Sequence, residues 1–358
     1  MKRFCAVLAI AAVAAVTACT DHPTDPDEGP ALKALGSPFN GITVMSRNLY
    51  VGTDVDAVIA ALANDDPADD VPTLMAAIDI LQRTDYPTRA AAIAAEIDKA
   101  RPHAVGLQEV SDIDIDLSAL GVPVVIDIDF LPILQSALTG RGLDYVVAGS
   151  VKNIEAVPVP GISLIDYDVL LVDASRVTVD GVTSQNFAAN IGVVAPGVEL
   201  KRGWVHAEVT IGGAAYVLAT THLESGTGDP FGGLRALQVM ELIGQLPTDR
   251  PVILMGDLND FSGSPMHQAL VGSGFVDAWA SYRPGTAGFT CCHASDLSND
   301  RAEFDQRIDY VFTMGFDAGR LHGLMRRTGY RPSERLLGPA HSIWPSDHAG
   351  LVLRVKRP

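Results

Sequence analysis

Polar side chains follow several apolar segments of the sequence at the points where those segments end. Residues 251–254 are apolar enough for a strand buried on both faces, and Asp257 and Asn259 follow within a few positions. Placing carboxylates and amides beside a buried strand is unfavourable unless each group finds a partner. A cation or a reacting group would supply such partners, and an ordinary loop is the plain alternative.

The same pattern recurs elsewhere, each time near the end of an apolar segment. Taken singly, each such residue has an ordinary structural explanation, such as a hydrogen-bonded histidine or a strand-end carboxylate. Taken together, they combine the oxygen ligands that suit Mg²⁺, Mn²⁺ or Ca²⁺ with histidines. Metal-assisted attack of water on a phosphate ester needs that combination, because the cation neutralises the phosphate and a base prepares the water. These further positions are Asn48, Glu109, His222, Asp347 and His348.

Segments of strand character are spread along the chain and supply most of the positions from which these polar residues project. Two of them flank Gly212-Gly213, a pair typical of a tight hairpin turn, so antiparallel pairing is expected. The predicted strands lie within residues 41–46, 103–108, 143–149, 167–173, 202–211, 214–222, 251–256, 307–313 and 349–355.

Helical periodicity is clearest at residues 86–102, where Ile93 and Ile97 share one face and Pro102 marks the end. A second helix is expected at residues 232–246. Strands mixed with helices, without an intervening linker, predict a single α/β domain centred on two packed sheets.

The order of the polar motifs resembles the endonuclease/exonuclease/phosphatase superfamily, which includes deoxyribonuclease I-like nucleases, bacterial sphingomyelinases and inositol-polyphosphate phosphatases. The resemblance extends from Gly41 to Val355. It implies a four-layer α/β sandwich, in which two packed mixed sheets are flanked by helices and the site lies at one end of the sheets. The successive motifs are RNLY, LQEV, THLES, GDLND, RIDYVF and SDHAGL.

The resemblance also implies a metal site. Glu109 is similar to the principal Mg²⁺ ligand of that superfamily, and Asn48 and Asp347 match positions close to the metal. The expected cofactor is therefore Mg²⁺, with Mn²⁺ or Ca²⁺ as alternatives.

Catalytic roles follow from the same resemblance. Asp257 resembles the residue that orients or deprotonates the attacking water, and Asn259 resembles the amide that holds the scissile phosphate. His222 resembles a phosphate-binding or leaving-group-side histidine. His348 resembles the histidine directed at the phosphate, and Asp309 the carboxylate that orients it, a pairing that fixes the imidazole tautomer. Asp257 and His348 both remain candidates for the general base, and we favour Asp257.

The charge of the chain bears on its substrate. The formal net charge is −17 at pH 7, which repels polyanions and disfavours long nucleic acid as the main partner. A small or lipid-derived phosphodiester or phosphomonoester is therefore the expected substrate. The alternatives are an extracellular nuclease, helped by the basic stretch 320–357, a non-catalytic binding protein on the same fold, and a calcium-dependent structural protein.

The N-terminus is expected to direct export, because Lys2 and Arg3 precede an apolar run too short to span a bilayer. The residues before Cys19 resemble a bacterial lipobox, and a plain secretory signal is the alternative. We expect a monomeric lipoprotein of the cell envelope, or otherwise a periplasmic or secreted protein. The predicted divisions are a signal peptide over residues 1–18, an acidic Pro-rich tether over 19–36 and one domain over 37–358.

The sequence also predicts the structure of three further segments. The adjacent pair Cys291-Cys292 is interpreted as either a vicinal disulfide or two reduced thiols, and its spacing does not suit structural zinc. Residues 52–85 are acidic and helix-prone, and are expected to overhang the site as a lid or wall. Residues 112–120 alternate aspartate with Ile and Leu, which favours a half-exposed edge strand over a calcium loop.

Overall fold

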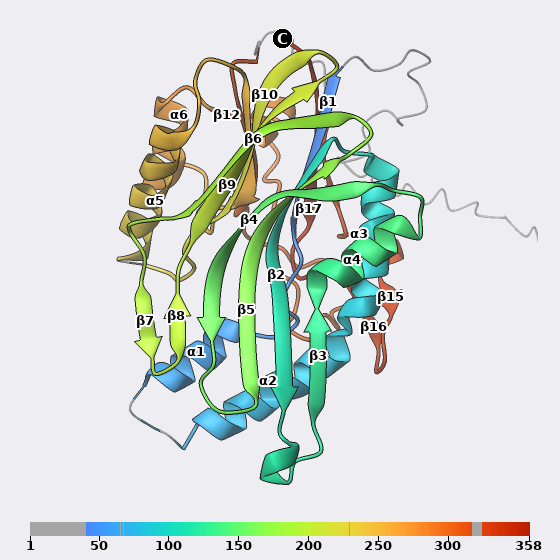
Figure 1. The fold of residues 1–358 in the computed structure, drawn as a ribbon, viewed down its shortest axis with the longest axis vertical. Helices are drawn as coiled ribbons and strands as arrows, with labels where there is room; N and C mark the ends of the chain where they lie inside the picture. Colours follow the sequence, from blue (N-terminus) through green and yellow to red (C-terminus); the bar gives the residue numbers. More distant parts are fainter. Residues whose placement is uncertain (1–40, 65, 67, 229, 317–323) are drawn as a thin grey trace, which may run out of the picture. The chain divides into compact units, whose positions relative to one another are not determined.

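The computed structural model describes residues 41–64, 66, 68–228, 230–316 and 324–358. Within these residues the chain forms two large mixed sheets that pack against each other, with helices on both outer faces (Figure 1). The predicted four-layer α/β sandwich is thereby confirmed. The predicted signal peptide, the lipidation site Cys19 and the tether all lie outside the described residues.

The larger sheet has nine strands in the order β14-β17-β1-β2-β5-β4-β8-β7, with β3 paired to β2. Most neighbours are antiparallel, but β1 and β2 run parallel. The strands are β1 (Gly41–Asn48), β2 (Ala104–Asp116), β3 (Val125–Asp129), β4 (Tyr145–Ala156), β5 (Ile162–Asp173), β7 (Gly192–Ala195), β8 (Val198–Leu200), β14 (Leu324–Thr328) and β17 (Gly350–Lys356).

The smaller sheet has six strands in the order β12-β13-β11-β10-β9-β6. The predicted hairpin at Gly212-Gly213 joins β9 and β10, and both glycines have positive φ, as a tight primed turn requires. The strands are β6 (Val177–Asn186), β9 (Gly203–Ile211), β10 (Ala214–His222), β11 (Val252–Asp257), β12 (Val276–Asp277) and β13 (Asp309–Met314), and a separate pair is formed by β15 (Leu336–Leu337) and β16 (Ser342–Ile343).

Helices cover the outer faces of both sheets. One core cluster packs α2, α3 and α4 on the larger sheet, a second lies between the sheets, and a third packs α5 and α6 on the smaller sheet. None of the helices in the described part of the chain is long and apolar enough to cross a membrane. The helices are α1 (Val55–Ala63), α2 (Asp70–Thr84), α3 (Tyr86–Ala100), α4 (Phe130–Thr139), α5 (Phe231–Gln245), α6 (Pro265–Gly272) and α7 (Ala278–Tyr282).

Parallel strand pairs bring the predicted site residues together. In the larger sheet, β1 and β2 are parallel, and their pairing ends at Asn48 and Gln108, one residue before Glu109. In the smaller sheet, β10 and β11 are parallel, and His222 pairs with Asp257 in the register. Gly256 makes this pairing possible, because a Cβ there would lie 2.1 Å from the carbonyl oxygen of Thr221.

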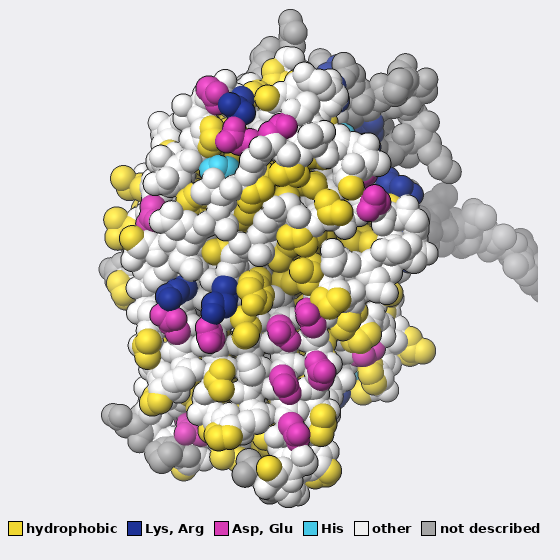
Figure 2. All heavy atoms as spheres, in the orientation of Figure 1, with side chains coloured by type: hydrophobic (Ala, Val, Ile, Leu, Met, Phe, Trp, Pro, Cys, Tyr) yellow, Lys and Arg dark blue, Asp and Glu magenta, His cyan; other side chains and the backbone are white. Residues whose placement is uncertain are grey.

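Of the strand predicted at residues 112–120, residues 112–116 are confirmed as the end of β2, but the predicted placement at a sheet edge is wrong. It pairs with β5 on one side and with β3 on the other, so aspartates oppose one another across β2 and β3, as in Asp112 with Asp129. Ile113 and Ile115 turn the other way into the core. Figure 2 shows acidic side chains gathered over β2 and β3, which leaves a negatively charged face on this part of the sheet.

Candidate active site

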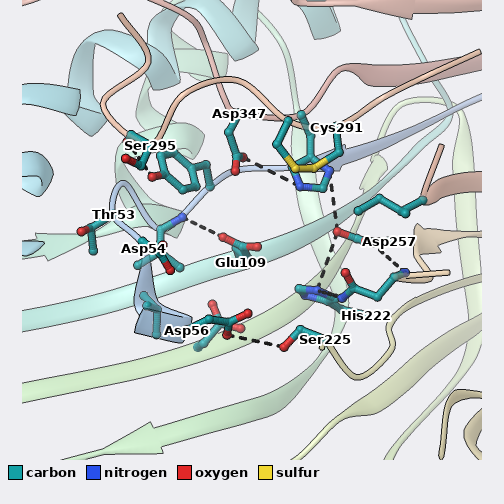
Figure 3. Close-up of a pocket in the computed structure, with 18 of the residues that line it drawn as sticks. Thr53, Asp54, Asp56, Glu109, His222, Ser225, Asp257, Cys291, Ser295 and Asp347 are labelled. Carbon is teal, nitrogen blue, oxygen red and sulfur yellow. Dashed lines mark hydrogen bonds and ion pairs between the residues drawn. A yellow bond between two sulfur atoms is a disulfide. The ribbon is translucent and has the colours of Figure 1, made fainter. Parts of the chain in front are cut away.

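The predicted site residues meet at one cavity of about 420 Å³ between the ends of the two sheets (Figure 3). Asn48 and Asp309 lie just beneath the surface of the cavity and bond to residues that line it. No member of the predicted set is isolated from the others. The predicted residues that line the cavity are Glu109, His222, Asp257, Asn259, Asp347 and His348.

Glu109 owes its position to a β-bulge. The register of β2 against β5 shifts between Leu107 and Val110, and Glu109 has a φ of 57°. A bulge turns a side chain away from the regular alternation of the strand. One carboxylate oxygen then accepts the backbone N–H of Val51 at 2.8 Å, and the other faces Asn48.

Asn48 links the acids of the two sheets. Its amide nitrogen donates to Glu109 at 2.8 Å and to Asp257 at 3.2 Å, while its oxygen accepts the backbone N–H of Tyr50 at 2.8 Å. The amide oxygen is therefore engaged within the protein. In this arrangement Asn48 fixes the distance between the two carboxylates, and its predicted proximity to a metal ion stays a prediction.

His348 lies between carboxylates. Its Nδ1 donates to Asp309 at 2.8 Å and lies 3.7 Å from Asp257, and its Nε2 lies 3.9 Å from Asp347. Burial alone would lower the pKa of His348, but the surrounding carboxylates, led by Asp309 and Asp347, raise it well above the usual range. His348 is therefore the cationic histidine of the site.

His222 is its neutral counterpart. Burial, followed by the positive charges of Arg202 and His348, lowers the pKa of His222 well below its usual range. Nδ1 lies 3.3 Å from a guanidinium nitrogen of Arg202, and Nε2 lies 3.0 Å from the amide of Asn259. A neutral imidazole has one accepting nitrogen, so it accepts a hydrogen bond from one of these two donors and not from both.

Two carboxyl groups of the site, Asp257 and Asp347, have raised pKa values. Burial raises the pKa of Asp257 to about 7, with Asp309 adding to the rise and His348 opposing it. Burial likewise raises the pKa of Asp347 to about 7, with His348 opposing and Glu109 adding. A further positive charge in the cavity would stabilise the ionised forms of Asp257 and Asp347.

The donor set fits a hard divalent cation. Glu109 and Asp347 present carboxylate oxygens to the cavity, and such oxygens are preferred by Mg²⁺, Mn²⁺ and Ca²⁺. A second set of donor atoms, on Asp257, Asp309 and His348, lies within 4.8 Å of one another. That set would have to lose the hydrogen bond between His348 and Asp309 to bind a cation, so Glu109 and Asp347 fit a cation better.

Cys291 and Cys292 are joined as a disulfide that forms part of the cavity wall (Figure 3), and their sulfur atoms lie within 4.8 Å of a ring nitrogen of His348. Of the two states that the sequence allows, the structure has the oxidised one. The neighbouring His293 and Ser295 also line the cavity, so the loop that carries the disulfide closes this side of the site.

Residues 52–85, which were predicted to overhang the site, form α1, α2 and the segment before α1, and among the described residues of this range those that line the cavity are Thr53, Asp54, Val55 and Asp56. Thr53, Asp54 and Asp56 line the cavity on the side opposite Asp257 (Figure 3). Asp54 caps α1 by accepting the backbone N–H of Ala57 at 2.9 Å. The acidic start of α1 therefore stands at the rim of the site.

Two buried arginines that the sequence analysis missed hold the site loops in place. Arg89 of α3 donates to the carbonyl oxygens of Leu49 and Pro345, at 2.5 and 3.3 Å, and so ties the loop after β1 to the loop before β17. Arg47 donates to the carbonyl oxygen of His348 and pairs with Glu96. A signal for Arg89 was available, because it lies one helical turn before Ile93 on the face predicted to be buried.

Comparison with known protein families gives one match. The family model described as "Endonuclease/Exonuclease/phosphatase family" matches residues 80–348, which contain all the predicted site residues except Asn48. No curated protein matches the chain significantly.

Solved structures share the fold at low sequence identity. An endonuclease/exonuclease/phosphatase family protein from Bacteroides thetaiotaomicron is 15% identical with a TM-score of 0.54, covering 89% of this chain and 98% of that one. A mannosyl-6-phosphatase from Bacteroides thetaiotaomicron VPI-5482 is 15% identical with a TM-score of 0.52, covering 88% and 99%. Truncated Caenorhabditis elegans TDP2 is 17% identical with a TM-score of 0.50, covering 88% and 97%. At such identities these similarities establish the fold alone.

Proposed function

Since the chain belongs to the endonuclease/exonuclease/phosphatase family, as its motif order predicts, it is a divalent-metal-dependent hydrolase of phosphate esters, and we propose that its substrate is a small or lipid-derived ester. The cavity of about 420 Å³ lies within the range of roughly 300–1,000 Å³ that is typical of small-molecule sites. Long nucleic acid is the less favoured substrate.

The observation that carries this proposal is the charge around the cavity. Asp54 and Asp56 are exposed at its rim. Among the described residues that line it there is no lysine, and the single arginine, Arg202, is buried and paired with Glu224 at 3.3 Å. A polyanion gains most of its affinity from cationic side chains against successive phosphates, and this rim offers it acids instead.

The proposed reaction is in-line attack of water on phosphorus. Asp257 is the proposed base, because its pKa of about 7 suits proton transfer near neutral pH. His348, protonated and held by Asp309, is proposed to bind the phosphate as a cation. His222 and Asn259 are proposed to bind phosphate oxygens from the other side of the cavity.

A divalent cation held by Glu109 and Asp347 would neutralise phosphate charge and polarise the P–O bond. We propose Mg²⁺, with Mn²⁺ or Ca²⁺ as substitutes. Asn48 supports this arrangement by holding Glu109 beside Asp257 through its two hydrogen bonds.

The test is a substrate panel of bis-p-nitrophenyl phosphate, inositol phosphates, sphingomyelin, plasmid DNA and single-stranded RNA, each with Mg²⁺, Mn²⁺, Ca²⁺ or a chelator. We expect metal-dependent turnover with a higher kcat/KM for a small or lipid ester than for either polymer. A higher kcat/KM on DNA or RNA would make the protein a nuclease. Failure to cleave any member of the panel would favour a binding protein that has lost catalysis.

We also propose that the protein is exported and lipidated at Cys19, on the lipobox-like sequence before that residue. The expected result is that the protein partitions with membranes when expressed in a bacterium, and that Cys19→Ala releases it into the soluble fraction. Membrane partitioning of the Cys19→Ala variant equal to that of the wild type would contradict lipidation.

A further inference from the structure

An apolar groove lies beneath α1 and α2. Its volume is about 80 Å³. The helices supply one wall, and the larger sheet supplies the other through β2, β4, β5 and β8 (Figure 1). Apart from Thr53 and Ser163, every lining residue is aliphatic or proline: Val51, Val55, Val58, Ile59, Leu62, Leu74, Ala77, Ile78, Leu81, Ile113, Ile115, Ala156, Pro158, Ile162, Leu164 and Val198.

The groove adjoins the active-site cavity. Three residues, Val51, Thr53 and Val55, line both spaces. Val51 is also the residue whose backbone N–H binds Glu109 at 2.8 Å, so the segment that fixes the proposed metal ligand also begins the groove. A molecule whose phosphate reaches Glu109 therefore has an apolar space within reach along this segment.

The side chains of α1 that face the groove are incompletely buried. Four residues that line the groove are only half-buried: Val58, Ile59 and Leu62 of α1, and Leu74 of α2. A closely packed helix would bury such residues, since burying an aliphatic side chain stabilises by about 1.5–3 kcal/mol. The remaining apolar surface is available to a ligand.

A polar atom marks the junction of the two spaces. The side-chain oxygen of Thr53 is buried and has no hydrogen-bond partner, and Thr53 as a whole is 9% exposed. A buried hydroxyl without a partner costs about 1–3 kcal/mol. A ligand that passes from the cavity into the groove would bring an oxygen or hydroxyl to this atom.

We propose that the groove binds an alkyl or acyl chain esterified to the phosphate that the active site cleaves, and that Thr53 binds a polar group near the start of that chain. This inference rests on the proposed function and narrows its substrate to a lipid-derived phosphate ester. The continuity of the groove with the cavity favours a substrate chain over an unrelated apolar ligand.

The size of the groove sets how much chain it holds. A space of about 10–15 Å³ holds one water-sized group, so about 80 Å³ holds roughly five to eight carbon atoms in a row. Longer chains extend beyond the groove and gain nothing further from it. Each buried methylene contributes about 0.8 kcal/mol, which corresponds to a roughly fourfold gain in kcat/KM per carbon at most.

The experiment is a chain-length series on the wild-type full chain. Alkyl p-nitrophenyl phosphates and alkyl phosphates, from methyl to decyl, are compared with Mg²⁺ below their micelle concentrations. We expect kcat/KM to rise about twofold to fourfold per carbon and to level off near five to eight carbons. Cleavage of the short esters with no dependence of kcat/KM on chain length would contradict binding of the chain in the groove but leave the proposed function intact.

If no ester in either series is cleaved, the proposed function fails, and calorimetric binding of octyl phosphate against methyl phosphate then tests the groove alone. Equal affinities for octyl phosphate and methyl phosphate would contradict binding of an alkyl chain in the groove.

A matched pair of variants locates the chain. Val58→Phe fills the groove from α1, whereas Val71→Phe adds the same volume on α2 at a position that is 65% exposed and outside the groove. We expect Val58→Phe to lower kcat/KM for the octyl ester to the value for short esters, with methyl ester turnover unchanged. Val71→Phe should change neither. A folded Val58→Phe protein with the wild-type chain-length profile would place the chain elsewhere.

Discussion

The catalytic cavity and the apolar groove are neighbours that are built in opposite ways. In the cavity the predicted site residues have specific partners, as Asn48 has in Glu109 and Asp257. In the groove the side chains share only apolar contacts, and several on α1 remain half-buried. Hydrogen bonds fix atoms to within tenths of an ångström, whereas apolar contacts depend on area and have no direction.

Because of this difference, we expect the cavity to determine the chemical step and the groove to determine the preference among substrates. Chemistry at phosphorus needs fixed donors and charges, so we expect changes in the cavity to lower the rate for every ester alike. Binding of a chain needs only area, so changes in the groove should alter the preference among esters and leave the chemical step alone. The ratio of kcat/KM for the octyl and methyl esters separates these effects.

Glu109→Gln should have the largest effect. Losing the carboxylate charge removes the proposed principal metal ligand, and metal stabilisation of the transition state is worth several kcal/mol, or about 10³–10⁴-fold in kcat/KM. The octyl to methyl ratio should not change. Steady-state kinetics across Mg²⁺ concentrations measure both, with Asp114→Asn, an exposed position on the same strand, as control. Activity near the wild-type value would remove Glu109 from the proposed site.

His348→Ala should rank next. The variant lacks the cation held between Asp309 and Asp347, and groups of this kind contribute about 10²–10⁴-fold, so we expect a loss of about 10³-fold for both esters. Circular dichroism and thermal unfolding check that the domain still folds. Full activity on any cleaved substrate would show that the role given to His348 is wrong.

The sequence predicts the cavity far better than the groove, for a physical reason. Cavity residues such as Asp257 end apolar strands, and a buried polar group at a strand end is a local, readable signal. β6 was missed because its outward face is polar and its strand form depends on pairing with β9. The bulge that turns Glu109 into the cavity depends on the register with β5, which no local pattern encodes.

The groove leaves no local signal at all, since its walls come from segments far apart in the chain. Ile59 and Leu62 are ordinary helix residues, and Ile115 is an ordinary strand residue. Only tertiary packing puts them around one space.

Asp309→Asn should have a smaller effect than loss of His348 itself. Removing a group that supports a catalytic histidine typically costs about 10–100-fold. Asp309 is the carboxylate that contributes most to raising the pKa of His348, so the variant lowers that pKa. If protonated His348 is the active form, the alkaline limb of the pH profile moves to lower pH. A profile that does not move would mean that the protonation of His348 does not control the rate.

Leu62→Ala tests the groove through the ratio of kcat/KM for the octyl and methyl esters. Removing part of its wall should lower kcat/KM for the octyl ester about tenfold, since some of the chain loses its apolar contact, and leave the methyl ester unchanged. The octyl to methyl ratio therefore falls, whereas the cavity variants leave it constant. An equal loss on both esters would show that the two regions are not independent.

Thr53→Val should have the smallest effect, and it acts on the boundary between the two regions. Valine has the same shape without the unpaired hydroxyl, so the free enzyme should gain about 1 kcal/mol of stability, or a rise in Tm of about 1–3 °C. If a substrate oxygen binds that hydroxyl, the variant loses about 0.5–1.5 kcal/mol of binding, a twofold to tenfold fall in kcat/KM. A more stable protein with a lower kcat/KM would mean that the unpaired atom is kept for the ligand. A gain in stability with no loss of kcat/KM would make Thr53 a packing defect, and the groove would then depend on its apolar walls alone.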